Sequence, residues 1–161
     1  MEARTVRSVL DSYWDGVLPV NPDIIAQQMG INVLPLNSER NPNVSGMAEI
    51  LSDGKKMIGY NKFDSHSRIR FTVAHELAHH VLGHTALYNR CLRDYSTNSN
   101  PDNPRVETEA NRFAAELLMP GDAVNMLVKR EGVTDINKLA YYFDVSEKAM
   151  YWRLKNLGYP I

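Results

Sequence analysis

The sequence lacks most of what a secreted or membrane protein needs. Its single cysteine, Cys91, excludes an internal disulfide and a zinc site built from several cysteines. Acidic residues such as Glu2 and Asp11 interrupt the apolar segment that a secretory signal requires, and no later apolar run is long enough to cross a bilayer. We therefore expect a cytoplasmic protein that does not enter a membrane.

The sequence also lacks an excess of charge of either sign. Lys and Arg total 18, Asp and Glu total 19, and the formal net charge is −1. No field of the whole protein therefore attracts nucleic acid or anionic lipid, and direct binding of nucleic acid would need a local basic patch. With 161 residues, 43% of them hydrophobic, the chain has the size of one domain, 1–161, with its own core.

The apolar periodicity and the turn residues predict the N-terminal half. A helix covers the apolar positions from Ala3 to Trp14, and a short second helix follows Asn21-Pro22 and ends at Gly30. Three strands come next, at 31–36, 46–51 and 57–60, the last two joined by the turn Ser52-Asp53-Gly54. These strands are expected to form a small, mostly antiparallel sheet.

The second half of the chain is predicted to be helical. Apolar residues recur every four positions from Ile69 to Val81, and a second apolar stripe runs from Pro104 to Pro120. Between these helices, 85–103 is expected to form a helical turn and then a loop. Asp122, Thr134 and Ser146 are candidate caps for three more helices, which make a helical subregion over about 121–161. The fold class is α+β, with helices packed on the sheet.

The five histidines are gathered before the middle of the chain, and this clustering points to a site: His66, His75, His79, His80 and His84. Two of them frame the motif His75-Glu76-Leu77-Ala78-His79, an H-E-x-x-H sequence on the predicted helix. A spacing of four residues places both imidazoles on one face, where they can hold a metal ion beside Glu76. A helix with ordinary surface histidines is the alternative interpretation.

A zinc site of this kind takes a third protein ligand and leaves a fourth position open for water and substrate. His84 does not have the spacing of the zinc proteases that use a third histidine six residues after the second. Glu107 is the better candidate, because small Ala110 and Ala114 let its helix approach the motif helix closely. Glu109 is the competing candidate.

Two segments carry a resemblance to a known family, FTVAHELAHHVLGH at 71–84 and ETEANRFAAELLMP at 107–120. They resemble the ImmA/IrrE family of zinc metallopeptidases, and the resemblance extends to 20–31 and to the hairpin at Gly46. It implies a zincin-like core, one Zn²⁺ per chain, and Glu107, the first glutamate of E-x-x-A-N, as third ligand. It also implies a cytoplasmic endopeptidase that is often paired with a helix-turn-helix repressor, which it cleaves, while other members occur in toxin–antitoxin-like pairs.

The expected mechanism follows from such a site. Zinc held by His75, His79 and Glu107 lowers the pKa of its water, and Glu76 acts as general base and then passes the proton to the leaving amine. Another divalent ion such as manganese suits the same ligands. Asn111, one turn past Glu107, is a candidate to accept the outer N–H of a ligating histidine, although a plain surface asparagine fits equally well.

Other polar residues near the motif are left without a catalytic role. His80 and His84 are expected at the helix surface or as caps, and Cys91 as a small buried residue and not a nucleophile. The group that stabilises the oxyanion stays unassigned among five chemically suitable candidates: His66, Tyr88, Arg105, Tyr141 and Tyr142.

The segment from Leu139 to Leu154 has the pattern of a helix-turn-helix, which makes a DNA-binding regulator the alternative hypothesis. Four cations and three carboxylates in 134–161 leave this segment only weakly positive, whereas a DNA reader carries a clearer basic face. We therefore favour packing or docking of a partner protein for these helices. The expected partner is a helix-turn-helix (Xre-type) repressor or an antitoxin, and a toxin role is the third hypothesis.

Overall fold

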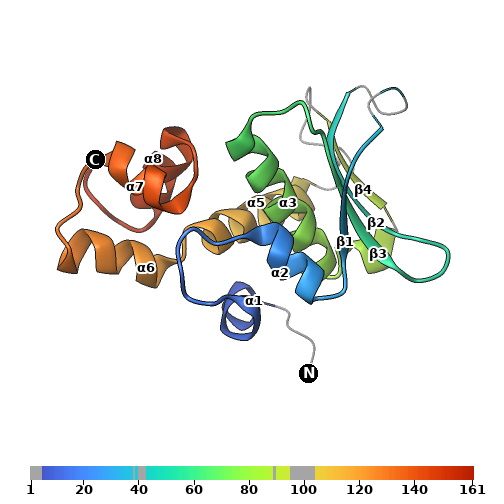
Figure 1. The fold of residues 1–161 in the computed structure, drawn as a ribbon, viewed down its shortest axis with the longest axis horizontal. Coiled ribbons are helices and arrows are strands. Elements are labelled where there is room, and N and C mark those ends of the chain that lie inside the picture. The colour runs from blue at the N-terminus through green and yellow to red at the C-terminus, as the bar shows by residue number, and fades with distance from the viewer. Residues whose placement is uncertain (1–4, 38, 40–42, 89, 95–103) are drawn as a thin grey trace.

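A computed structural model of the chain describes residues 5–37, 39, 43–88, 90–94 and 104–161. Within these ranges it contains eight α-helices, one π-helical turn and four strands, which confirms the α+β class (Figure 1). The helices are α1 (Val6–Tyr13), α2 (Pro22–Gln28), α3 (His66–Val81), α4 (His84–Tyr88), α5 (Pro104–Leu118), α6 (Gly121–Asn125), α7 (Ile136–Phe143) and α8 (Glu147–Asn156), and the π-helical turn Met126–Arg130 follows α6. The strands are β1 (Asn32–Pro35), β2 (Val44–Ile50), β3 (Lys56–Tyr60) and β4 (Arg90–Asp94).

Helix α3 lies at the centre of the molecule, between the sheet and α5 (Figure 1). Ser65 caps its start by accepting a hydrogen bond from the backbone N–H of Arg68, and Gly83, at φ +81°, follows its end. From Thr72 to Val81 every residue of α3 is buried. A helix that is covered on all sides must satisfy its polar side chains inside the protein, and those of α3 include the H-E-x-x-H motif.

The sheet has the strand order β1-β3-β2-β4. Strands β2 and β3 form an antiparallel hairpin, β4 pairs antiparallel with β2, and β1 pairs parallel with β3. The predicted mostly antiparallel sheet is therefore confirmed. The hairpin turn contains Gly54 at φ +83°, a conformation that favours glycine.

Three local predictions are wrong. Asp122 does not cap α6, because the cap position is Pro120 and Asp122 lies inside the first turn. The segment 85–103 was expected to hold no strand, yet Arg90–Asp94 forms β4, whose Cys91 is paired with Ala48 of β2. These five residues lack a clear alternation of apolar and polar side chains, so the sequence gives no strand signal, and the strand forms because it pairs with the distant strand β2. The remainder of the expected loop, 95–103, lies outside the described residues. The cap of α7 is Asp135 and not Thr134, because the Asp135 carboxylate accepts the backbone N–H of Asn137 at 2.8 Å.

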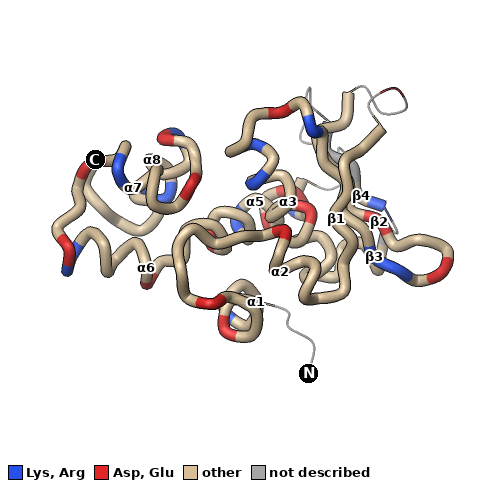
Figure 2. The backbone as a smooth tube through the Cα atoms, in the orientation of Figure 1, with Lys and Arg blue, Asp and Glu red and all other residues tan. Residues whose placement is uncertain are grey.

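The predicted helix pair at the C-terminus is confirmed as α7 and α8, which lie at the end of the molecule away from the sheet (Figure 1). Phe143, Met150 and Leu154 are buried between these helices and the core, whereas Trp152 is about half exposed. Figure 2 shows acidic as well as basic positions on this pair and on the turns beside it. None of the described helices is long and apolar enough to cross a membrane.

One buried guanidinium joins the C-terminal helices to α3. Arg70 donates hydrogen bonds to the carbonyl oxygens of Val20 at 2.7 Å, Asp144 at 2.9 Å and Phe143 at 3.3 Å. The Asp144 carboxylate also lies 3.4 Å from Arg70 Nε and 2.7 Å from His66 Nε2. Because Asp144 has φ 54°, its backbone turns sharply after α7 and directs both of its oxygen groups at α3.

Replacing Arg70 by methionine should destabilise the fold strongly. The change leaves three carbonyl groups and the Asp144 carboxylate without a buried donor, a loss on the order of 3 kcal/mol or more in the free energy of unfolding. Urea unfolding measures it. The matched control is Arg7→Met, which removes only exposed ion pairs and should cost less than about 1 kcal/mol; equal losses in both variants would contradict the role of Arg70.

Candidate metal centre

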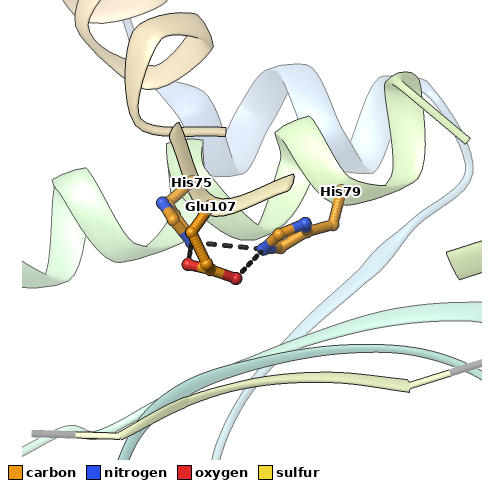
Figure 3. A group of neighbouring side chains, drawn as sticks. All are labelled: His75, His79 and Glu107. Atoms are coloured by element: carbon orange, nitrogen blue, oxygen red, sulfur yellow. Dashed lines mark hydrogen bonds and ion pairs between the residues drawn. The ribbon is translucent and has the colours of Figure 1, made fainter. Parts of the chain in front are cut away.

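Helices α3 and α5 bring three potential metal ligands to one point. His75 and His79 lie one turn apart on the same face of α3, and Glu107 lies in the first turn of α5 (Figure 3). The Nε2 atoms of the two histidines are 3.2 Å apart. The Glu107 carboxylate lies 3.0 Å from His75 Nε2 and 3.3 Å from His79 Nε2. One ligand atom from each residue thus falls within a span of 4.8 Å.

Burial sets the electrostatics of this cluster. The side chains of His75, His79 and Glu107 are 0%, 1% and 4% exposed. Burial by itself would raise the pKa of Glu107, but hydrogen bonds from the two histidines and their charges lower it to about 2. Glu107 is therefore a carboxylate and not a carboxylic acid, as a metal ligand must be.

The donor set fits a divalent metal ion. Two imidazole nitrogens and one carboxylate oxygen are typical ligands of zinc, and three protein ligands leave a further position open. Both histidines direct Nε2 inward and leave Nδ1 on the outer side of the ring. A buried anion beside two close imidazole nitrogens is also the arrangement that a bound cation stabilises. The sequence prediction for this cluster thus corresponds to residues that the structure brings together.

Glu76 is fully buried on α3 and lies against the sheet. The contact is made at Gly46 of β2, where an added Cβ atom would stand 2.4 Å from Thr72 Cγ2 and 2.8 Å from Glu76 Oε1. Only a residue without a side chain lets the strand come this close to the helix. The glycine inside an apolar strand was the available sequence signal for this approach.

Glu109 does not join the cluster. Its side chain is 42% exposed and accepts hydrogen bonds from His84 Nε2 at 3.1 Å and from Arg105 Nε at 3.2 Å. The hydrogen bond with His84 is the largest cause of the lowered pKa of Glu109. Of the two competing glutamates, Glu107 is the one that faces the histidines.

The expectation that His80 and His84 lie at the surface is wrong, since each is only 5% exposed. His80 Nε2 lies 2.8 Å from the Met57 carbonyl oxygen and Nδ1 lies 3.0 Å from Thr85 Oγ1. Burial lowers the pKa of His80 to about 4, so this ring is neutral at pH 7. His84 Nδ1 lies 2.9 Å from His79 Nδ1, a contact that the sequence analysis missed.

Asn111 lies one turn beyond Glu107, on the wall of a groove of about 560 Å³ between α3, α5 and α8. Phe71 lines the same groove, and its ring centroid is 6.2 Å from that of His75. His75 Nδ1 has no hydrogen-bond partner within the described part of the chain, so Asn111 makes no bond to it in this structure. The role of Asn111 beside a ligating histidine stays a prediction.

The structure also locates the other polar residues that the sequence analysis considered. Cys91 is buried as expected, and burial together with Glu76 and Glu107 raises the pKa of its thiol to about 12, which makes it a poor nucleophile. His66 is bound to Asp144, Arg105 to Glu109, and Tyr141 is 83% exposed on α7. The structure assigns no oxyanion role to these residues or to Tyr142, and the Tyr88 side chain lies outside the described part.

Substituting Gly46 by alanine tests the close contact between β2 and Glu76. The new methyl group overlaps with the buried, β-branched Thr72, and overpacking of this kind costs about 1–3 kcal/mol of unfolding free energy. Gly59→Ala on the neighbouring strand is the control, because its methyl group meets only the flexible end of Leu36. Chemical unfolding should rank Gly46→Ala clearly below Gly59→Ala; the reverse order would contradict the contact.

Comparison with known proteins agrees with this geometry. A profile of the IrrE N-terminal-like domain, peptidase M78, matches residues 26–155. Comparison with curated proteins gives no significant match. Eight chains of solved structures match. One of them is described as a Mycobacterium tuberculosis transcriptional regulator, with a TM-score of 0.64 and 18% identity over 96% of this chain and 46% of that chain.

The likeness to that regulator shows a shared fold, and this chain spans less than half of its length. The profile match says more, because it covers most of the sequence and includes all three residues of the His75, His79 and Glu107 cluster. The chain belongs to the family of the IrrE N-terminal-like domain, peptidase M78.

Proposed function

We propose that this protein is a zinc-dependent endopeptidase of the gluzincin type, with His75, His79 and Glu107 as zinc ligands and Glu76 as general base. The observation that carries the proposal is the buried convergence of two imidazole Nε2 atoms and one carboxylate from two different helices. Structural histidines on a helix surface do not produce it. Membership of a peptidase family supports the same reaction class.

In the proposed peptide hydrolysis, the metal ligands and Glu76 have different roles. When bound, zinc lowers the pKa of a coordinated water and polarises the carbonyl of the substrate. Glu76 follows His75 directly on α3, and its buried carboxylate is the candidate that accepts the proton of the water and returns it to the leaving amine. Packing of Glu76 against Gly46 restricts the orientation of this carboxylate.

Two features suit an extended protein substrate. Strand β4 is an edge of the sheet and the neighbour of β2, which contacts α3, so a peptide can pair along its outer side. The groove between α3, α5 and α8 extends from Phe71 and Asn111 to Trp152 and can receive substrate side chains. The groove comes near the cluster at Phe71, whose ring centroid is 6.2 Å from that of His75.

The proposed substrate is one partner protein in the cytoplasm, a helix-turn-helix repressor or an antitoxin. One of the matching solved structures is described as a transcriptional regulator, which suits a role in the control of gene expression. Cys91 as the sole, buried cysteine suits a reducing compartment. Direct binding of DNA by α7 and α8 is disfavoured, because the four cations and three carboxylates of 134–161 leave this segment only weakly positive. In addition, the turn residue Asp144 is held by Arg70 and His66.

Metal analysis of purified protein tests the ligand set. With zinc in excess before desalting, the wild type should retain about one zinc ion per chain. Glu107→Ala should retain almost none, because it removes a buried ligand, whereas Glu109→Ala removes a carboxylate outside the cluster and should keep the metal. Plasma mass spectrometry gives the ratios; a wild type without metal, or loss with Glu109→Ala only, would contradict the assignment.

Glu76→Gln separates catalysis from metal binding. The variant keeps the shape of the side chain but loses the base, so we expect zinc content equal to wild type and cleavage reduced by at least about a hundredfold. Cell lysate treated with either protein is analysed by mass spectrometry for new N-termini. The wild type should create them in very few proteins, and an equally active Glu76→Gln would overturn the role of this residue.

A further inference from the structure

A chain of side-chain contacts leads from the metal centre to the protein surface. It begins at the outer nitrogen of a proposed ligand, where His79 Nδ1 lies 2.9 Å from His84 Nδ1. The other ring nitrogen of His84, Nε2, lies 3.1 Å from Glu109 Oε2, and Glu109 Oε1 lies 3.2 Å from Arg105 Nε. His79 and His84 are 1% and 5% exposed, whereas Glu109 is 42% exposed at its side chain.

Two imidazole nitrogens can share a hydrogen bond only when one carries a proton and the other does not. A neutral His79 that binds a metal through Nε2 carries its proton on Nδ1 and must donate to His84. His84 then accepts at Nδ1, carries its own proton on Nε2, and donates to the Glu109 carboxylate. When both rings are neutral and Glu109 is ionised, one arrangement of protons satisfies every contact in the chain, and it is the arrangement that metal binding requires.

We propose that His84 and Glu109 are positioning residues that hold His79 in its metal-binding tautomer and orientation. The proposal rests on the proposed metal site and deepens it. A carboxylate that receives the outer N–H of a ligating histidine is a common device for fixing the ring and raising its basicity. Here a second histidine stands between the ligand and the carboxylate, which lets an exposed glutamate reach a buried centre.

The two proposed ligand histidines differ in this respect. His79 is held on its outer side by His84, whereas His75 Nδ1 has no hydrogen-bond partner in the ranges that the structure describes. Among the proposed ligands, His79 is thus the one through which His84 would act on the metal site.

His80 provides a matched control. It is as deeply buried as His84, at 5% exposed, and lies in the last turn of α3 next to His79. Its ring nitrogens contact Met57 and Thr85, neither of which belongs to the cluster. Removing His80 thus reports the general effect of losing a buried histidine, without the contact to His79.

The test measures the zinc dissociation constant by competition with a chelator, and the absorption spectrum after loading with Co²⁺. His84→Leu should weaken zinc binding by about 10- to 100-fold and shift the Co²⁺ bands. His84→Asn should recover most of the affinity, because its amide oxygen replaces ring Nδ1 as acceptor. Glu109→Ala should weaken binding by a smaller factor, and His80→Asn should leave the affinity and the spectrum unchanged.

An unchanged dissociation constant and spectrum for His84→Leu would overturn the inference, as would equal losses in His84→Leu and His80→Asn.

Nitrogen-15 NMR of the zinc-loaded wild type needs no variant and gives a second test. It should find the proton of His79 on Nδ1 and that of His84 on Nε2, and a His84 proton on Nδ1 would contradict the inference. A wild type that binds no zinc overturns the proposed function with it, whereas a zinc-binding wild type with an unaffected His84→Leu overturns only this inference.

Discussion

The close packing of α5 against α3 is the constraint on which the rest of the structure depends. Fully buried alanines on both helices, Ala74 and Ala78 on α3 and Ala110 and Ala114 on α5, let the backbones approach. That approach carries Glu107 into the interior, where a lone carboxylate is costly. The two histidines of α3 offset the cost, as would the cation that this donor set fits, so that the helix packing and the His75, His79 and Glu107 cluster depend on each other.

Other buried polar side chains of α3 are also bound by groups from neighbouring elements. Arg70 binds backbone carbonyls, His80 binds the carbonyl of Met57 in the sheet, and His79 reaches His84. Most polar groups of a buried helix need a partner that another element supplies. The sheet, α4, α5 and the C-terminal helices supply them, so α3 connects most parts of the fold through its polar residues.

Sequence reasoning identified what is local. The spacing of His75 and His79 and the small residues beside Glu107 predict the cluster, and helix periods and turn glycines predict most elements. It does not identify features that depend on distant partners. Strand β4 is stabilised by its pairing with β2. The structural role of Arg70 depends on the carbonyl group of Phe143, which is distant in the sequence. The spacing of His84 argues only against its role as a third ligand. The sequence gives no signal for the contact between its Nδ1 atom and Nδ1 of His79.

The contact between Arg70 and Asp144 has a mechanical consequence. Asp144 begins the turn between α7 and α8, whereas Arg70 lies on α3 within two helical turns of His75. A protein that binds and displaces the C-terminal helices would therefore also pull on Arg70, and through Arg70 on the helix that carries His75 and His79. The same link ties α7 and α8 to the rest of the fold, because a chain cut before α7 would keep the buried Arg70 but lose two of its acceptors, the carbonyl groups of Phe143 and Asp144.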